Sequence, residues 1–378
     1  MRICVDLTSL ADNFSGIERF ALSITKELLR DEKHHWILLF KNSIHKEFEK
    51  AQAEKIVLKG NNKLVFNQII LPLNLLKIKA DRYFFPAFPA PFFFFNKDAF
   101  NTIHDLSCWD CPGSNKRYMI WYFKLMYWKA SLFNKKIVTV SEFSKNRICS
   151  ILHVKPQNIV VVYNGVSKQF NSEKIDDSGK KQVIDKYSLP SSYILSLSTL
   201  EPRKNLRLLL DACAELYEEG VVDDIVLAGR KGWKMNDFLS GYQEEFLSHV
   251  YFTGFVDDED LPAIYKMAKL FVFPSQYEGF GIPPLEAMAC GTRVVSSDAA
   301  SMPEVLGNAA AYFKSKNLPA LKIVLKNELN LVEGNSTFVE SGIQQAKKFN
   351  WNNEAVKLIC FFVSANKNLE ENHEQKVD

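Results

Sequence analysis

The sequence predicts an α/β protein with two doubly wound domains in tandem, and three observations support this fold class. Short apolar runs alternate with helical or loop segments along most of the chain. A polar stretch, NSEKIDDSGKK, separates two such alternating series. The length of 378 residues also exceeds one ordinary core, because domains hold roughly 100–200 residues each.

The first half is predicted to form repeated strand–helix units. The run ICVDL is followed by a loop, and IERFALSITKELL then places apolar residues at helical spacing. Six further apolar runs follow: HWILLF, KIVLKG, DRYFFP, FNTIHDL, KIVTVS and NIVVVYNG. This alternation is typical of a parallel sheet covered by helices, so six or seven strands fill one domain. We expect this domain at 1–172 and a linker at 173–190.

The second series begins at YILSLST and predicts a second domain at 191–348. It contains two helical segments and four apolar runs: NLRLLLDACAELYEEG and DEDLPAIYKMAKL, then DIVLAG, VYFTGF, LFVFPS and TRVVSS. Ligands of such sheets lie beyond the carboxyl ends of the strands, so we expect the domains to face each other across a cleft that holds the active site. NWNNEAVKLICFFVSA predicts a last amphipathic helix within 349–378, before a polar tail.

Composition and charge argue against several classes of protein. No basic-then-apolar leader precedes the first strand, and the 14-residue apolar stretch at 83–96 contains three prolines, whereas a membrane span needs ~20 continuous residues. Seven scattered cysteines indicate reduced thiols in a cytoplasmic protein. Residues 1–170 carry 25 basic and 14 acidic side chains, against 22 and 30 in the rest. The first half is therefore expected to face nucleic acid, a membrane or a phosphorylated lipid.

The segment SQYEGFGIPPLEAMACG, residues 275–291, places two glutamates around a glycine-rich turn. Gly279 and Gly281 permit positive φ and a close approach of backbone to ligand. The prolines after them suit the start of a helix, which puts Glu286 in its first turn. Such a helix start offers N–H groups to phosphate, and a carboxylate there can accept from ribose hydroxyls. Alternatively, Glu286 only complements the helix dipole and Glu278 is a solvated loop residue.

Arg203 and Lys204, in STLEPRKNLRLLLDA, fall between a predicted strand and a predicted helix. Cations at a helix start oppose the helix dipole, so another partner must stabilise them. A diphosphate leaving group needs fixed positive charge, for which arginine gives a two-pronged donor and lysine a point charge. The alternative is a pair of exposed surface charges.

Three features of the first half are weaker candidates. His104 ends a predicted strand beside Asp105 and could contact the reacting sugar, or it could be a core or capping histidine. Ser141 is predicted to cap a helix. Gly16 belongs to NFSGIERF, which is not a dinucleotide fingerprint, and we expect a loop there that closes over the cleft.

No metal or other cofactor is expected. Asp258 and Asp260 match the letters of a D-x-D metal motif, but they are better explained as acids in the first turn of a helix. Arg203 and Lys204 are available to neutralise phosphate in place of a divalent ion.

The stretch SNKRYMIWYFKLMYWKASLFNKK, residues 114–136, mixes six cations with aromatic side chains. Basic-aromatic helices rest on anionic membrane surfaces. The alternative is that the aromatic residues are core and the lysines are solvated. Nucleic acid is the third possibility, but no recognisable module supports it, so no nucleic-acid partner is expected.

Five motifs together resemble the retaining glycosyltransferases of family four: EPRKN, EGFGIPPLEAMACGTRVVSSDAASMPEV, IHDLS, TVSEFSK and VYNGV. The resemblance implies the two-domain GT-B fold, with the last helix crossing back to the first domain. It also implies roles for individual residues. Glu278 would lie by the donor sugar, Glu286 would bind the ribose, Arg203 and Lys204 would hold the diphosphate, His104 would lie near the transferred sugar, and Gly279, Phe280, Gly281, Ile282 and Gly16 would contact the nucleotide sugar.

The chain departs from this family at two positions. Ser198 stands where many members have glycine, which places more of the charge burden on Arg203 and Lys204. Arg293 replaces a proline, a change we expect to be neutral.

The resemblance further favours GDP-mannose or dTDP-rhamnose as donor and a lipid-diphosphate-linked glycan of capsule or other surface polysaccharide as acceptor. Such an enzyme would be cytoplasmic and peripheral at the inner face of the membrane. Two alternatives are a non-catalytic protein of the same fold that binds a glycan or another transferase, and an epimerase, whose additional acids the sequence does not provide.

Overall fold

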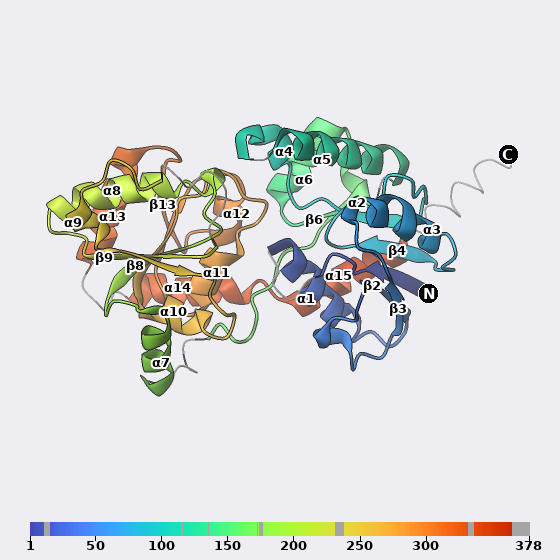
Figure 1. Cartoon of the computed structure of the whole chain (residues 1–378), viewed down its shortest axis with the longest axis horizontal. Helices are drawn as coiled ribbons and strands as arrows, with labels where there is room; N and C mark the ends of the chain where they lie inside the picture. Colours follow the sequence, from blue (N-terminus) through green and yellow to red (C-terminus); the bar gives the residue numbers. More distant parts are fainter. Residues whose placement is uncertain are drawn as a thin grey trace. The chain divides into compact units, whose positions relative to one another are not determined.

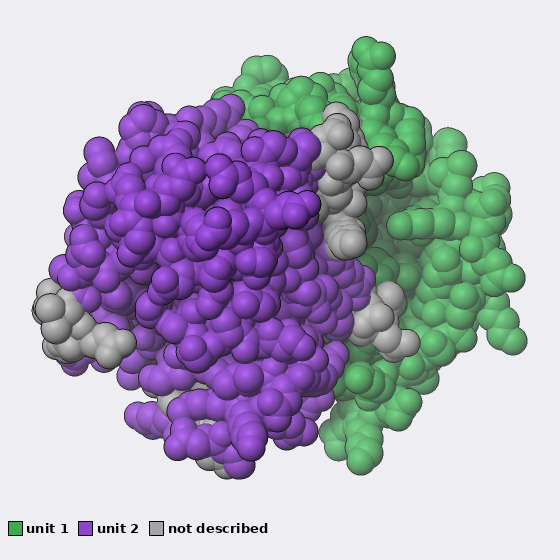
Figure 2. All heavy atoms as spheres, turned by 60° about the vertical axis from the view of Figure 1, so that its left-hand side comes forward, with its two compact units in different colours: residues 1–164, 350–378 green, residues 165–349 purple. Residues whose placement is uncertain are grey.

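The computed structural model describes residues 1–10, 16–114, 116–134, 136–171, 173, 177–230, 238–331 and 336–364. The chain forms two compact units, coloured separately in Figure 2. Unit 1 comprises Met1–Asn164 and Asn350–Asp378, and unit 2 comprises Gly165–Phe349. Each unit contains one parallel sheet with helices on its faces (Figure 1). The predicted α/β class is confirmed.

Unit 1 contains a seven-stranded parallel sheet in the order β3-β2-β1-β4-β5-β6-β7. All seven apolar runs predicted in this half form its strands. These are β1 (Arg2–Asp6), β2 (His35–Lys41), β3 (Glu54–Leu58), β4 (Arg82–Phe85), β5 (Ala99–Thr102), β6 (Lys136–Thr139) and β7 (Ile159–Val161). Strands β2, β4 and β5 are buried over most of their length, which explains their nearly continuous apolar sequences, whereas the edge strand β3 buries only Leu58.

One face of this sheet is covered by short helices between the strands. They are α2 (Lys63–Val65), a π-helical segment (Phe66–Ile70), α3 (Leu71–Leu75), α4 (Ser107–Asp110), α5 (Arg117–Lys129), a second π-helical segment (Ala130–Asn134) and α6 (Glu142–Leu152). Phe66, Leu71 and Leu75 pack on β1, β2 and β4, and α6 packs on Ile137 of β6. Ile137 of β6 pairs with Asn101 of β5, so the two side chains point to the same face of the sheet. Ala99, two residues before Asn101, points to that face as well and packs in the core beneath α3. All these helices therefore lie on one face.

The opposite face is covered by α1 (Gly16–Leu28) and by α15 (Trp351–Ser364), which comes from the far end of the chain. The ring of Phe362 lies 5.4 Å from Phe84 and 4.8 Å from Phe100. The Nε atom of Arg82 donates to the Phe362 carbonyl at 3.0 Å. The predicted last helix thus returns to the first domain, while its predicted polar tail lies outside the described residues.

Unit 2 contains a six-stranded parallel sheet in the order β10-β9-β8-β11-β12-β13. The strands are β8 (Tyr193–Leu197), β9 (Asp224–Ala228), β10 (Val250–Gly254), β11 (Ala268–Phe273), β12 (Val294–Ser297) and β13 (Ala311–Phe313). The first five are the predicted ones. The prediction missed β13, the three-residue strand AYF.

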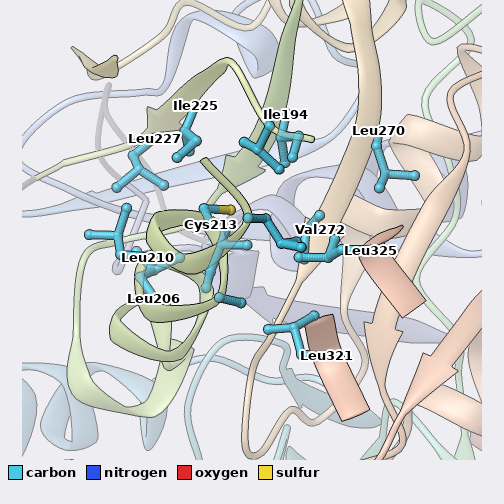
Figure 3. Packing of buried hydrophobic residues seen from close by; sticks show 14 of the residues in the cluster. Ile194, Leu206, Leu210, Cys213, Ile225, Leu227, Leu270, Val272, Leu321 and Leu325 are labelled. Carbon is cyan, nitrogen blue, oxygen red and sulfur yellow. The ribbon is translucent and has the colours of Figure 1, made fainter. Parts of the chain in front are cut away.

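The helices of unit 2 are α7 (Asp177–Tyr187), α8 (Leu206–Glu218), α9 (Glu244–Leu247), α10 (Leu261–Met267), α11 (Ile282–Ala289), α12 (Met302–Leu306), α13 (Leu318–Asn330) and α14 (Ser336–Lys347). Figure 3 shows how the core joins α8 and α13 to the sheet: Leu206, Leu210 and Cys213 lie with Ile225 and Leu227, and Leu321 and Leu325 lie with Leu270 and Val272. This packing holds α8, and the turn before it, at the carboxyl end of β8.

Two segments differ from the sequence predictions. The linker expected at 173–190 contains α7, which the polar sequence did not reveal, because Val183 is the one buried side chain of this helix. Lys186 Nζ also lies 2.8 Å from Asp257 and 2.6 Å from Asp260. The acids expected in the first turn of α10 precede it, since the helix starts at Leu261 with Pro262 second. None of the described helices is both long and apolar enough to span a membrane.

Candidate functional site

The carboxyl ends of two neighbouring strands, β8 and β11, bring together residues that are 74 positions apart. Arg203 and Lys204 lie on the short 3₁₀ turn Pro202–Lys204 that follows β8, and Glu278 follows β11. Lys204 Nζ donates to Glu278 Oε1 at 2.7 Å, and Arg203 Nη1 donates to Oε2 at 2.9 Å. We call these three residues the Glu278 cluster.

Local backbone geometry explains why the two loops meet. Pro202 starts the 3₁₀ turn, and Asn205 ends it in the left-handed region with φ 56° before α8 begins. The backbone N–H of Gln276 donates to the Arg203 carbonyl at 2.9 Å, which joins the turn to the loop after β11. The cations are therefore held by backbone contacts as well as by their charges.

All three side chains of the Glu278 cluster are largely removed from water. The side chains of Arg203 and Lys204 are 16% and 15% exposed, and that of Glu278 is 10% exposed. The alternatives of exposed cations and a solvated loop glutamate are therefore wrong. Arg203 and Lys204 lie just before the start of α8, where the helix dipole disfavours positive charge, and the carboxylate of Glu278 stabilises them.

Burial and charge act in opposite directions on these groups. Burial alone would raise the pKa of Glu278, but Arg203, Lys204 and the hydroxyl of Ser275 lower that pKa to about 2. Burial lowers the pKa of Lys204, and Glu278 works against that shift. Glu278 is thus a buried carboxylate that stays ionised at neutral pH.

Three further side chains support the cluster, and sequence reasoning missed them. Ser275 Oγ donates to Glu278 Oε1 at 2.6 Å, and Arg203 Nη2 donates to Glu201 Oε1 at 3.0 Å. Ser301 Oγ contacts the carbonyls of Glu278 at 3.1 Å and Phe280 at 3.0 Å. Ser275 and Glu201 lie within the motifs already noted. Their nearness in sequence to Glu278 and Arg203 was the signal that could have predicted these contacts.

The glycine-rich turn leads into α11 through Gly281, which is the N-cap with φ 91°. A Cβ atom there would lie 2.3 Å from Cε of Met302, so close packing adds to the need for glycine. Gly279 and Phe280 are buried, and Ile282 begins the helix with Pro283 after it. The amides that this helix start can offer to a ligand come from Ile282 and the preceding loop, since proline has no N–H. The helix stops at Cys290 and Gly291, as predicted.

Glu286 does not lie in the first turn of α11, which corrects the sequence prediction. Because Gly281 sets the start of the helix at Ile282, Glu286 is its fifth residue. It is 3% exposed, and its Oε2 accepts from the hydroxyl of Tyr265 at 2.9 Å. Complementing the helix dipole does not explain a carboxylate at this depth.

A row of aromatic rings links the surroundings of the two glutamates. The ring centroid of Tyr265 lies 5.4 Å from that of Phe271, which lies 6.2 Å from that of Phe273. Lys204 Nζ lies 5.6 Å from the ring centroid of Phe273.

The remaining predicted residues lie in unit 1. His104 follows β5, and its Nε2 lies 3.0 Å from the Pro86 carbonyl. Because a carbonyl only accepts, Nε2 carries the proton and Nδ1 is the acceptor of the ring. Burial lowers the pKa of His104 to about 4, so the ring is neutral at pH 7. Gly16 is the first residue of α1, and the loop 11–15 lies outside the described residues. Ser141 caps α6 as predicted.

No group of three metal-ligating His, Cys, Asp or Glu side chains is found within the described ranges. Asp260 of the D-x-D letters and Asp257, which precedes them, both pair with Lys186. None of the seven cysteines, which all lie within the described residues, forms a disulfide.

Comparison with known proteins places the chain in a family. Residues 180–333 match the model of "Glycosyl transferases group 1". O-antigen chain mannosyltransferase B from Escherichia coli is 34% identical over 262 residues, which are 68% of this chain and 67% of that protein. The chain belongs to the glycosyl transferases group 1 family. The family resemblance that the sequence motifs predicted is therefore confirmed.

Two other proteins extend the comparison of the glycosyltransferase. Serotype-specific mannosyltransferase WbdA from Escherichia coli is 33% identical over 228 residues, covering 58% of this chain but only 27% of WbdA. The crystal structure of HepE from Anabaena in complex with UDP and glucose has a TM-score of 0.71 at 15% identity and covers 96% of this chain and 100% of that one. At this identity the likeness supports the GT-B fold alone.

Proposed function

We propose that the enzyme transfers a hexose, with retention of anomeric configuration, from a nucleotide-sugar donor to a growing surface polysaccharide. The Glu278 cluster carries the proposal. It places two fixed cations and a buried carboxylate at the carboxyl ends of β8 and β11, where a doubly wound sheet binds its ligand.

The departing diphosphate explains the two cations. When the bond between the anomeric carbon and the diphosphate oxygen breaks, its electron pair stays on the diphosphate, and the sugar resembles an oxocarbenium ion. The acceptor hydroxyl oxygen would bond to that carbon from the same side, and its proton would pass to the departing diphosphate. Lys204 has three N–H donors, one of which goes to Glu278. Glu278 thus orients the ammonium group while leaving donors for a phosphate oxygen. Arg203 would act on the same diphosphate as a planar donor.

The other residues would hold the two ends of the donor. The carboxylate of Glu278 would also orient the transferred sugar, Glu286 would accept from the ribose hydroxyls, and the loop from Gly279 to Ile282 would contact the phosphates. His104, neutral with Nδ1 as acceptor, would steady a sugar hydroxyl, and Gly16 would belong to a loop over the donor. In this proposal no residue needs to act as a covalent nucleophile, and no metal is required because Arg203 and Lys204 neutralise the diphosphate.

Relatives suggest the sugar and the acceptor. Both curated relatives compared are mannosyltransferases, and one is named for the O-antigen chain. HepE, of the same fold, was crystallised with UDP and glucose. We favour GDP-mannose as donor, ahead of dTDP-rhamnose, and a lipid-diphosphate-linked glycan at the inner membrane face as acceptor.

Sugar transfer itself tests the proposal. The purified protein is incubated with GDP-mannose, dTDP-rhamnose and UDP-glucose in turn, with a lipid-linked acceptor, and the anomeric configuration of the product is determined by NMR. We expect transfer from one donor with retention, and a loss of at least 100-fold in kcat for Lys204→Ala. Lys326→Ala is the matched control, because that lysine also pairs with a glutamate, at the other end of α8.

Two results would reject the proposal. Unchanged transfer by Lys204→Ala and Glu278→Ala would remove the Glu278 cluster from the reaction. Neither transfer nor binding with any nucleotide sugar would favour the non-catalytic alternative, a protein that keeps the fold to bind a glycan or another transferase.

A further inference from the structure

Helix α5 of unit 1 exposes an apolar stripe. Tyr118, Trp121, Leu125 and Trp128 are 69%, 74%, 47% and 53% exposed. Their spacing of three and four residues places them on one face of the helix. A stripe with this spacing ordinarily faces a protein core, yet in α5 the buried positions are Met126 and Lys129 instead.

A second exposed stripe lies on the segment α2 to α3, which covers the same face of the sheet as α5 (Figure 1). Its exposed members are Leu64, Val65, Ile69, Leu73 and Leu76. The buried members of the same segment, Phe66, Leu71 and Leu75, pack on the sheet. The segment is therefore apolar on both sides, one for the core and one for another partner.

Polar and aromatic contacts join the two stripes through the phenylalanine-rich loop at 91–95. Gln68 donates from Nε2 to the Tyr122 hydroxyl at 3.3 Å and accepts from the Phe92 N–H at 3.0 Å. The buried Lys129 of α5 donates to the carbonyls of Pro91 at 3.2 Å and Phe94 at 2.5 Å. These contacts hold the loop against both helical segments.

The loop adds its own exposed rings. Phe93 and Phe95 are 62% and 54% exposed, and Phe95 lies 5.1 Å from Phe133, which follows α5 and is also exposed. We use "apolar surface" for the exposed side chains of the three segments: Leu64, Val65, Ile69, Leu73, Leu76, Phe93, Phe95, Tyr118, Trp121, Leu125, Trp128, Leu132 and Phe133. Soluble proteins rarely expose a large contiguous apolar patch without a partner.

Within the segments that form the apolar surface the charges have one sign, and Asp81, Asp98 and Asp110 lie just outside them. The sequence has no Asp or Glu at 61–80, 82–97 or 111–141. Six cations in or beside these segments are exposed: Lys63, Lys77, Lys79, Lys97, Lys116 and Arg117. An occupant of this surface must therefore accept apolar side chains and offer negative charge.

We propose that the apolar surface docks on an anionic lipid bilayer. Trp, Tyr and Leu side chains insert at the boundary of headgroups and acyl chains, while the cations contact the headgroups. The alternative that the aromatic residues of 114–136 are core holds only for the inward face of α5. The inference deepens the membrane location in the proposed function by assigning it to two helical segments and a loop, and its test does not depend on sugar transfer.

Co-sedimentation of the full chain with vesicles tests the inference. The vesicles contain either phosphatidylcholine alone or phosphatidylcholine with phosphatidylglycerol. We expect binding to the anionic vesicles and a loss of at least tenfold in partitioning for Trp121→Glu/Leu125→Glu and for Leu73→Glu/Leu76→Glu. Replacing Lys116 and Arg117 with glutamine should weaken binding to the anionic vesicles about fivefold per cation. Binding to the neutral vesicles should not change.

The matched control is Ile323→Glu/Val356→Glu, which places charges at exposed apolar positions of α13 and α15. It should bind within twofold of the wild type. Circular dichroism should be unchanged in every variant, which separates lost docking from a failed fold. Vesicle binding is measured whether or not the protein transfers a sugar, which separates this test from that of the proposed function. Equal binding by wild type and both surface variants would overturn the inference. So would a dimer in light scattering that the surface variants dissociate, since a second copy would then be the occupant.

Discussion

Glu278 is buried and yet ionised, because two cations and a hydroxyl surround its carboxylate. Charge assistance makes each of these hydrogen bonds stronger than a neutral one. The carboxylate therefore has a structural role, holding Arg203 and Lys204 together, as well as the proposed role toward the sugar.

Loss of that carboxylate should destabilise the protein. Glu278→Ala leaves Arg203 and Lys204 buried without their shared partner, a kind of change that costs ~3–5 kcal/mol. Urea unfolding followed by circular dichroism measures the free energy. Glu215→Ala removes a half-exposed carboxylate that pairs with Lys322, and it should cost less than ~1 kcal/mol. Equal costs for the two variants would contradict the account of the Glu278 cluster.

The lowered pKa of Glu278 predicts a dependence of stability on pH. A carboxyl whose pKa is lower in the folded state stabilises the protein fully above its ordinary pKa of 4.5. This contribution is lost as the pH falls toward about 2. Glu278→Gln should thus lose less unfolding free energy than the wild type between pH 5 and pH 3, measured by urea titration. Parallel losses in both proteins would show that the pKa is not lowered.

At the scale of the residue, the sequence predicted the charged residues of the site but not the side chains that form hydrogen bonds around them. Arg203, Lys204 and Glu278 were predictable, because residues that follow neighbouring strands meet at one edge of a parallel sheet. Ser301 and Tyr265 were not, because their contacts depend on side-chain directions that no spacing reveals. The position of Glu286 in its helix was wrongly predicted because it depends on where the helix starts, which Gly281 sets as the N-cap.

At the scale of the element, α11 and the turn before it position the loop of the candidate site. Gly281 gives the turn its positive φ and passes close to Met302 of α12. Ser301, at the start of α12, bonds two carbonyls of the same turn. The shape of the loop thus depends on α12 as much as on its own sequence.

Gly281→Ala should therefore strain this loop. The new methyl group would meet Met302, and the left-handed φ would add about 1–2 kcal/mol, so we expect a total loss of about 2–4 kcal/mol in urea unfolding. The pair Gly281→Ala/Met302→Ala should be less destabilised than the sum of the single variants, since one contact is common to both. Additive costs would mean that the two residues do not meet.

Elements were predicted where apolar runs were long, and were missed where they were short or polar. Twelve strands lie in segments that the sequence predicted, whereas β13 was missed and α7 has Val183 as its one buried side chain. Periodicity reports burial of apolar side chains, so a helix that is mostly exposed leaves little signal in the sequence.

At the scale of the molecule, the last described helix, α15, covers part of one face of the sheet of unit 1. Leu358 and Phe362 of α15 are fully buried, and Phe362 lies among the rings of Phe84 and Phe100. The alternation of strands predicted two domains, but it was the resemblance to a family that predicted the return of this helix.

Phe362→Ala should destabilise unit 1 selectively. Truncation of a buried phenylalanine costs ~3–5 kcal/mol, and hydrogen exchange should rise in the strands of unit 1 while those of unit 2 are unchanged. Val356→Ala, at a position of the same helix that is 55% exposed, should leave exchange unaltered. Increased exchange confined to unit 2 would contradict the assignment of α15.

The central claim, that the Glu278 cluster binds the diphosphate of the donor, is tested most directly by calorimetric titration with GDP. Lys204→Met should raise the Kd about 10- to 100-fold, as expected for the loss of one hydrogen bond to a charged group. Lys326→Met, on α13, should bind within twofold of the wild type. Equal affinity of wild type and Lys204→Met for GDP would contradict the claim.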